Sequence, residues 1–153
     1  LGDRLGCLLV QLPPSLALDA PVARAFFASL RRLLPSSVGL AVEPRHASWF
    51  TPEADALLAH WQAARALADP VLHDAGGAPG GWPALVYCRL HGSPRTYYSA
   101  YDTGLIDALA TRLKAATQEA TQEARSVWCI FDNTASGAAT GNALDLQARL
   151  RSL

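Results

Sequence analysis

The segment "GLAVEPRHASWFTP" (residues 39–52) starts as a buried β-strand and finishes in charged side chains. Its first four residues are apolar or small, and Val38 directly before them lengthens the apolar run. A short apolar run of this kind is typical of a strand that is buried in a sheet. An acid, a guanidinium and an imidazole then follow within four positions: Glu43, Arg45 and His46. This ending predicts that packing stops, and a polar site begins, at the carboxyl end of the strand.

The same order of strand and helix repeats along the chain. Apolar runs predict strands at residues 6–12, 38–43, 65–69, 84–91 and 126–132. Helices are predicted between most of them, with caps at Asp19, Thr51 and Thr103, and a last helix carries Leu144, Leu146 and Leu150. Alternating strands and helices predict an α/β fold with parallel strands and right-handed crossovers.

Two α/β architectures fit this pattern, a doubly wound open sheet and part of a (β/α)₈ barrel. A complete barrel needs about 250 residues, and the chain of 153 residues supplies five strands of eight. We expect one domain over residues 1–153. The sequence contains no methionine and its first strand begins within a few residues of position 1, so we expect it to be a piece of a longer protein.

Composition excludes several classes of protein. The charges of thirteen basic and thirteen acidic side chains balance, so the chain has no excess positive charge to bind the phosphate backbone of a nucleic acid, and we predict no nucleic-acid partner. No apolar run approaches the roughly 20 residues that a membrane span needs, and no signal peptide is visible. Cys7, Cys88 and Cys129 lie in separate apolar runs, which predicts free thiols and a cytoplasmic protein. The sequence does not indicate an oligomeric state.

Polar side chains stand at the end of every predicted strand. In chain order they are Gln11, Glu43 with Arg45, Asp69, Arg89 with His91, and Asp132 with Asn133. The carboxyl ends of parallel strands meet at one edge, where functional groups collect in both architectures. Glu43 and Arg45 have the same parity along their strand as the small residues Gly39 and Ala41, so we expect them to point inward.

These side chains predict acid–base chemistry on a small anionic or polyhydroxylated metabolite. Glu43, His91 and Asp69 are the candidate acid–base groups, since neighbours in a cleft shift the pKa of such groups. Arg45 and Arg89 are predicted to converge on one carboxylate or phosphate. A hydrolase, an isomerase and a lyase all remain open, and Gln11 and Asn133 are candidate substrate-orienting groups.

Other interpretations of the same residues stay open. Glu43 with Arg45, and Arg89 with His91, also fit structural pairs, and a non-catalytic module that binds an anion or metabolite is the alternative function. A metal site formed by Glu43, His46, Asp69 and His91 is a further alternative, but no H-x-H or H-E-x-x-H spacing supports it, and we predict no metal. We predict no cofactor either, because "GGAPGG" lacks the Gly-Lys-Ser/Thr ending of a phosphate-binding loop.

Several motifs together resemble one protein family. "LLVQLPPSL", "AVEPRHASWFTPE", "LADP", "VYCRLHG" and "CIFDNTASGAATGNALDLQ" occur in the order and spacing of the DUF72, or YecE-like, family. The resemblance implies the last five βα units of a TIM barrel, without the first three strands, and implies no particular reaction. It also marks a set of polar positions: Gln11, Glu43, Arg45, His46, Asp69, Arg89, His91, Asn133 and Asn142.

The sequence departs from the family pattern at three positions near these residues. Pro44 stands where an aromatic residue is usual, and Ala47 where proline is usual. Asp132 replaces the first asparagine of a pair, so it adds a negative charge near the strand ends.

Overall fold

The computed structural model describes residues 1–118 and 126–152. Its strands are β1 (Cys7–Gln11), β2 (Gly39–Glu43), β3 (Ala63–Arg65), β4 (Leu67–Asp69), β5 (Gly80–Gly81), β6 (Leu85–Leu90) and β7 (Ser126–Phe131). Its α-helices are α1 (Ala20–Leu33), α2 (Pro52–His60), α3 (Thr103–Gln118) and α4 (Ala138–Ser152). Three short 3₁₀ helices are η1 (Gly2–Arg4), η2 (Ala47–Trp49) and η3 (Asp74–Gly77).

The strands form two open sheets, of order β1-β2-β3-β5 and β4-β6-β7. Their pairs are parallel except that the two-residue β5 runs antiparallel to β3. The α/β fold with parallel strands is therefore confirmed. In the part of the chain that the structure describes, the sheets do not close into a barrel.

The predicted strand at residues 65–69 was wrong, because two strands occupy this region. β3 pairs with β2, and the backbone N–H of Ala66 still donates to the carbonyl of Val42 at 2.8 Å. β4 instead pairs with β6, and the carbonyl of Asp69 accepts from the N–H of His91 at 2.8 Å. The segment changes partner at Ala66, which links the two sheets through one continuous stretch of chain.

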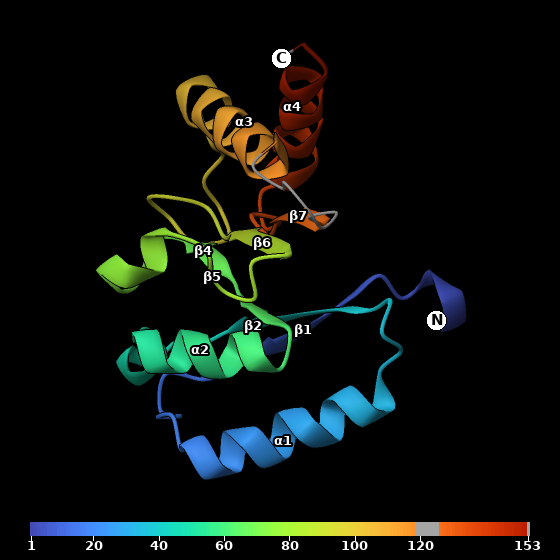
Figure 1. The fold of residues 1–153 in the computed structure, drawn as a ribbon. Helices are drawn as coiled ribbons and strands as arrows, with labels where there is room; N and C mark the ends of the chain where they lie inside the picture. The colour runs from blue at the N-terminus through green and yellow to red at the C-terminus, as the bar shows by residue number, and fades with distance from the viewer. Residues whose placement is uncertain (119–125, 153) are drawn as a thin grey trace.

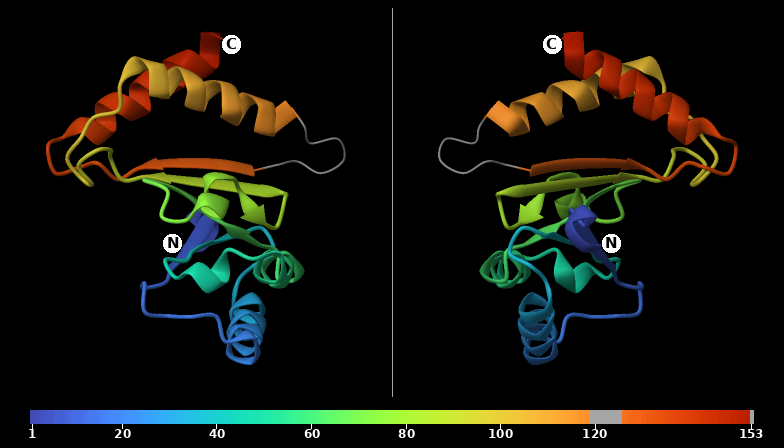
Figure 2. Two further views of the ribbon diagram at one scale, coloured as in Figure 1. Left: turned by 90° about the vertical axis from the view of Figure 1, so that its left-hand side faces the viewer. Right: turned by 90° about the vertical axis from the view of Figure 1, so that its right-hand side faces the viewer.

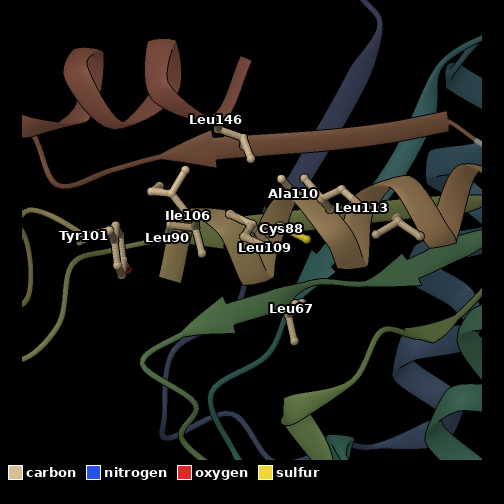
Figure 3. Packing of buried hydrophobic residues seen from close by; sticks show 10 residues of the cluster. Leu67, Cys88, Leu90, Tyr101, Ile106, Leu109, Ala110, Leu113 and Leu146 are labelled. Atoms are coloured by element: carbon tan, nitrogen blue, oxygen red, sulfur yellow. The ribbon is translucent and has the colours of Figure 1, made fainter. Parts of the chain in front are cut away.

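The two pairs of helices lie on opposite sides of the strands (Figures 1 and 2). Phe27 of α1 and Leu58 of α2 pack with Leu40 and Val42 in one apolar cluster. α3 and α4 cover β6 and β7, where Ile106, Leu109, Leu113 and Leu146 pack against Cys88 and Leu90 (Figure 3). The sheets are thus covered by helices on their outer faces.

A third cluster lies between the two sheets and contains small residues. Ala41, Ala64 and Ala66 pack there against Leu85 and Tyr87. Ala41 has the same parity as Glu43, and Tyr87 the same parity as Arg89. The expectation that Glu43 points inward is confirmed, and this inner face leads directly to the polar strand ends.

Helix caps explain where the helices begin. Asp19 accepts from the N–H of Val22 at 3.0 Å, and Thr51 accepts from the N–H of Ala54 at 3.2 Å, as predicted. The predicted cap of α3 was wrong by one residue, since Asp102 accepts from the N–H of Leu105 at 2.9 Å. None of the helices in the described ranges is both long enough and apolar enough to cross a membrane.

Candidate functional site

Glu43, the last residue of β2, lies at the centre of a group of charged side chains. Its side chain is only 1% exposed. Oε1 accepts a hydrogen bond from Nη2 of Arg45 and lies 3.2 Å from Nε2 of His91. Oε2 accepts from Nη1 of Arg89 at 3.0 Å. The two arginines and the histidine therefore converge on one carboxylate. Arg89 lies on β6, Arg45 follows β2, and His91 follows β6.

Asp132, directly after β7, is a second point of convergence. Its Oδ2 accepts from Nη2 of Arg89 at 2.8 Å and lies 3.0 Å from Nδ1 of His91. Nη1 of Arg89 also donates to Oε1 of Gln11, at the end of β1, at 2.6 Å. We call these six side chains the charged cluster: Gln11, Glu43, Arg45, Arg89, His91 and Asp132.

The charged cluster keeps Glu43 ionised. Burial raises the pKa of this carboxyl, but hydrogen bonds from His91 and Arg89 and the charges of Arg45 and Arg89 outweigh burial. The net result is a pKa lowered to about 2. A carboxylate with so low a pKa is a weak base at neutral pH. In this arrangement Glu43 acts as a fixed negative charge that holds the two guanidinium groups together.

The arginines are the most accessible cations of the cluster. The side chains of Arg45 and Arg89 are 19% and 18% exposed, whereas His91 is 1% exposed. Among the described residues Arg45 Nε is buried without a hydrogen-bond partner. The accessible part of Arg45 is therefore not its Nε, which is buried. Arg45 and Arg89 both contact Glu43, so they lie on the same side, and their convergence on a carboxylate or phosphate of a ligand stays a prediction.

Aromatic side chains of the loop after β6 lie beside the cluster. The ring of Tyr97 meets the imidazole of His91 edge to face, with 5.7 Å between their centroids. The guanidinium of Arg95 lies 3.8 Å above the ring centroid of Tyr98. Tyr97 and Tyr98 are exposed. They form an accessible rim next to the imidazole.

A second polar network lies at the same strand ends but closes on the backbone of this loop. Oδ1 of Asn142 accepts from the N–H of Tyr101 at 3.0 Å and from Nδ2 of Asn133 at 2.9 Å. Nδ2 of Asn142 donates to the carbonyl of Tyr101 at 2.9 Å, and Nδ2 of Asn133 donates to the carbonyl of Ser99 at 3.0 Å. We call Asp69, Tyr101, Asn133 and Asn142 the loop network.

Asp69 belongs to the loop network through Tyr101. The hydroxyl of Tyr101 donates to Oδ2 of Asp69 at 2.6 Å and accepts from the N–H of Gly92 at 2.7 Å. Burial, and then the hydrogen bond to Asp69, raise the pKa of Tyr101, so its hydroxyl stays protonated at neutral pH. The structure therefore places Asp69 with a structural tyrosine and does not join it to Glu43 and His91.

His46 lies outside both groups and caps a short helix. Its Nδ1 accepts from the N–H of Ser48 at 3.2 Å and contacts Oγ of Ser48 at 2.9 Å. That hydroxyl oxygen accepts from the N–H of Leu18 at 2.7 Å. His46 thus orders the segment between β2 and α2, and the structure does not bring it to the other predicted site residues.

The alternative metal site is not assembled. Within the described ranges, no three His, Cys, Asp or Glu side chains lie close enough together to hold a metal ion. Cys7, Cys88 and Cys129 are free thiols, as predicted. Burial raises the pKa of Cys88 to about 11 and that of Cys129 to about 12, so both stay protonated at neutral pH.

The predicted site residues thus divide into two groups and one outlier. Gln11, Glu43, Arg45, Arg89 and His91 come together, Asp69, Asn133 and Asn142 form a separate network, and His46 caps η2. Asp132 was noted as a strand-end residue but was not among the predicted site residues. The sequence feature that could have identified Asp132 is its alternation with Ile130 and Trp128, because these residues share the inner face with Arg89.

Comparison with known proteins identifies the family. The family model described as "Protein of unknown function DUF72" matches residues 1–153. The chain belongs to the DUF72 family. No curated protein matches the chain.

Two solved DUF72 structures share the fold. A DUF72 family protein from Enterococcus faecalis V583 is 23% identical with a TM-score of 0.69, and the match covers 97% of this chain and 60% of that chain. A DUF72 family protein from Thermotoga maritima MSB8 is 21% identical with a TM-score of 0.72, and the match covers 97% and 59%. The present chain therefore spans about three fifths of the length of each. At these identities the likeness shows the fold alone.

Proposed function

We propose that the charged cluster binds a small anionic or polyhydroxylated metabolite and that His91 exchanges a proton with it. The observation that carries this proposal is the convergence of Arg45, Arg89 and His91 on the buried carboxylate of Glu43. Burying charged groups is costly unless they are paired, so proteins that lack a use for them seldom gather so many.

The two arginines supply the binding energy in this proposal. A guanidinium presents several donors in a plane and matches a carboxylate or phosphate bidentately. The partial exposure of the Arg45 and Arg89 side chains supports the two guanidinium groups as the first contacts for the ligand. The charges of two guanidinium groups and two carboxylates balance within the cluster, which favours modest affinity for an anion over tight binding.

The acid–base role falls on His91 rather than on Glu43 or Asp69. Glu43 is a weak base because of its lowered pKa, and Asp69 already accepts a hydrogen bond from the hydroxyl of Tyr101. Each ring nitrogen of His91 can hold or accept a proton, and the two contact Asp132 and Glu43, which suits a group that exchanges a proton. Reaction types that need one such group, including hydrolysis and isomerisation, fit this arrangement.

We further propose that the inner face with its alanines is part of a closed (β/α)₈ barrel in a longer protein. The parallel strands, the helices on the outer faces and the small inner residues support this proposal. Closure would bring further strand ends to the charged cluster and so complete its walls.

A turnover screen tests the proposed activity. The protein is incubated with a panel of small carboxylates, phosphate esters and sugars, and each compound is followed by NMR for conversion or for exchange of carbon-bound hydrogen with deuterium. We expect conversion or exchange of at least one compound, and its loss in His91→Gln. His60→Gln is the matched control, because His60 lies on α2 away from the cluster. Binding without any conversion or exchange would instead support the non-catalytic binding module.

A further inference from the structure

Asp132 contacts both His91 and Arg89 with a single oxygen atom. Oδ2 lies 3.0 Å from Nδ1 of His91 and 2.8 Å from Nη2 of Arg89. The backbone holds this carboxylate in place, since the N–H of Asp132 donates to the carbonyl of Leu90 at 2.7 Å. The pairing of β7 with β6 thus continues for one residue beyond the strand and delivers Asp132 to the imidazole.

The chemistry of the contact fixes which imidazole nitrogen carries hydrogen. An ionised carboxylate only accepts hydrogen bonds, so Nδ1 of His91 must be the donor in this contact. In neutral His91 the other nitrogen, Nε2, is then unprotonated. The hydrogen bond made by one ring nitrogen commonly sets the state of the other in this way.

Nε2 has both an acceptor and a donor beside it, and the donor, on Arg45, lies nearer than the Glu43 carboxylate, which favours unprotonated Nε2 in neutral His91. Nη2 of Arg45, which only donates, lies 3.0 Å from Nε2, so unprotonated Nε2 can accept its hydrogen bond. Oε1 of Glu43 lies 3.2 Å from the same nitrogen and can accept from it once His91 is protonated. The ring of Tyr97 also contacts the imidazole, nearly at right angles to it. As long as Nδ1 keeps the proton that it donates to Asp132, Nε2 has a partner in both protonation states of His91. In neutral His91 this partner is Arg45, and in protonated His91 it is Glu43.

We propose that Asp132 is a positioning residue that holds a proton on Nδ1 of His91, so that Nε2 accepts from Arg45 in neutral His91 and donates to Glu43 or a bound ligand once His91 is protonated. The same oxygen holds Arg89 against Glu43, so Asp132 aligns the imidazole with one of the two arginines. The inference rests on the proposed function for the use of the His91 proton, but the arrangement itself exists without any substrate.

Asparagine at position 132 would change this arrangement in a definite way. An amide oxygen accepts a weaker hydrogen bond than a carboxylate does. The amide N–H₂ group only donates, so it cannot accept a hydrogen bond from Arg89 or from Nδ1–H of His91. A neutral residue would also leave Arg45 and Arg89 balanced by Glu43 alone. The Nδ1–H form would then lose most of its advantage over the Nε2–H form.

The tautomer of His91 can be measured directly. Long-range ¹H–¹⁵N NMR spectra of the 153-residue chain, with His91 assigned by the signals that His91→Gln removes, report which ring nitrogen carries hydrogen. We expect almost only the Nδ1–H form of neutral His91 in the wild type, and a mixture with a substantial Nε2–H share in Asp132→Asn. Asp132→Glu keeps a carboxylate and is expected to recover most of the Nδ1–H form. Asp145→Asn, which removes an exposed carboxylate on α4, is the matched control.

Two results would overturn the inference. One is a predominantly Nε2–H form in the wild type, which needs no variant to fold. The other is an Asp132→Asn spectrum with the same tautomer as Asp145→Asn. If the wild type shows the Nδ1–H form but the turnover screen finds no reaction, the proposed function fails while the role of Asp132 in positioning His91 stands.

Discussion

The charged cluster and the loop network lie at the same strand ends and differ in what their side chains contact. In the charged cluster, side chains contact one another, and the arginines keep nearly a fifth of their surface exposed. In the loop network, the amides of Asn133 and Asn142 contact backbone groups of the loop after β6, and both are buried. Polar residues at the end of a strand therefore serve two purposes here, a candidate site and the anchoring of its adjacent loop.

Charge separates the two groups better than position does, since among the described residues each group keeps one buried side-chain atom without a hydrogen-bond partner, Nε of Arg45 in one and Oδ1 of Asn133 in the other. The charged side chain of Arg45 is 19% exposed. Asn142 instead satisfies one N–H, one carbonyl and one amide, which leaves little for a ligand. We expect variants of the two groups to differ in whether they lose stability, ligand binding or both.

The largest effect is expected from titrating Glu43. Its pKa is about 2 in the folded protein, below the ordinary value of 4.5, so its ionised form stabilises the fold at neutral pH. This contribution is present above about pH 4.5 and is lost as the pH falls toward 2. A shift of this size corresponds to about 3 kcal/mol of unfolding free energy.

Denaturant unfolding between pH 7 and pH 2 measures this dependence. Glu43→Gln should flatten the curve below pH 5, because the variant has no carboxyl to protonate. Glu53→Gln, which changes an exposed carboxyl in the first turn of α2, should retain the wild-type slope. Equal slopes for Glu43→Gln and the wild type would show that Glu43 is not held by the arginines in solution.

The next effect concerns the centre of the loop network. Asn142→Leu should lower the unfolding free energy by about 2–3 kcal/mol, because it leaves the buried N–H and carbonyl of Tyr101 without partners. Gln147→Leu, at an exposed position of α4, is the control and should change stability by less than about 0.5 kcal/mol. A loss in Asn142→Leu no larger than in Gln147→Leu would contradict the structural role of the network.

A smaller effect is expected when one hydroxyl is removed. Tyr101→Phe loses the hydrogen bonds to Asp69 and Gly92 while it keeps the ring in the α3–α4 core. We expect a loss of about 1–1.5 kcal/mol in thermal or denaturant unfolding. Tyr98→Phe removes an exposed hydroxyl and should be neutral, so equal losses in the two variants would refute this assignment.

Much of the fold followed from the sequence because its signals are local. Apolar runs located β1, β2, β6 and β7 and the region of β3 and β4, though not the two-residue β5. Asp19 and Thr51 marked helix starts through side chains that act within three residues. The division of residues 63–69 into two strands was missed, because it depends on β2 and β6, which lie far away in the chain. Alternation along one strand does not encode a change of partner.

The candidate site was predictable only in part for the same reason. Parity predicted that Glu43 points inward, but it was not applied to Asp132, whose side of the sheet became clear only from the pairing of β7 with β6. The separation of Asp69 from Glu43 was not predictable, because it depends on the position of Tyr101 thirty-two residues later in the chain. The role of Asn142 depends likewise on the backbone of a loop that no local pattern specifies.

The central claim is that the charged cluster, and not the loop network, binds an anion, and titration with inorganic phosphate tests it most directly. Binding is followed by NMR shifts or calorimetry in the wild type, Arg45→Ala, Tyr101→Phe and Arg24→Ala, the last of which removes an exposed arginine on α1. We predict that the wild type binds phosphate weakly and that Arg45→Ala binds it at least tenfold more weakly, because it loses about 1.5–3 kcal/mol of charge-assisted hydrogen bonding. Tyr101→Phe and Arg24→Ala should bind phosphate within twofold of the wild type. Unchanged binding in Arg45→Ala, or an equal loss in Tyr101→Phe, would contradict the account.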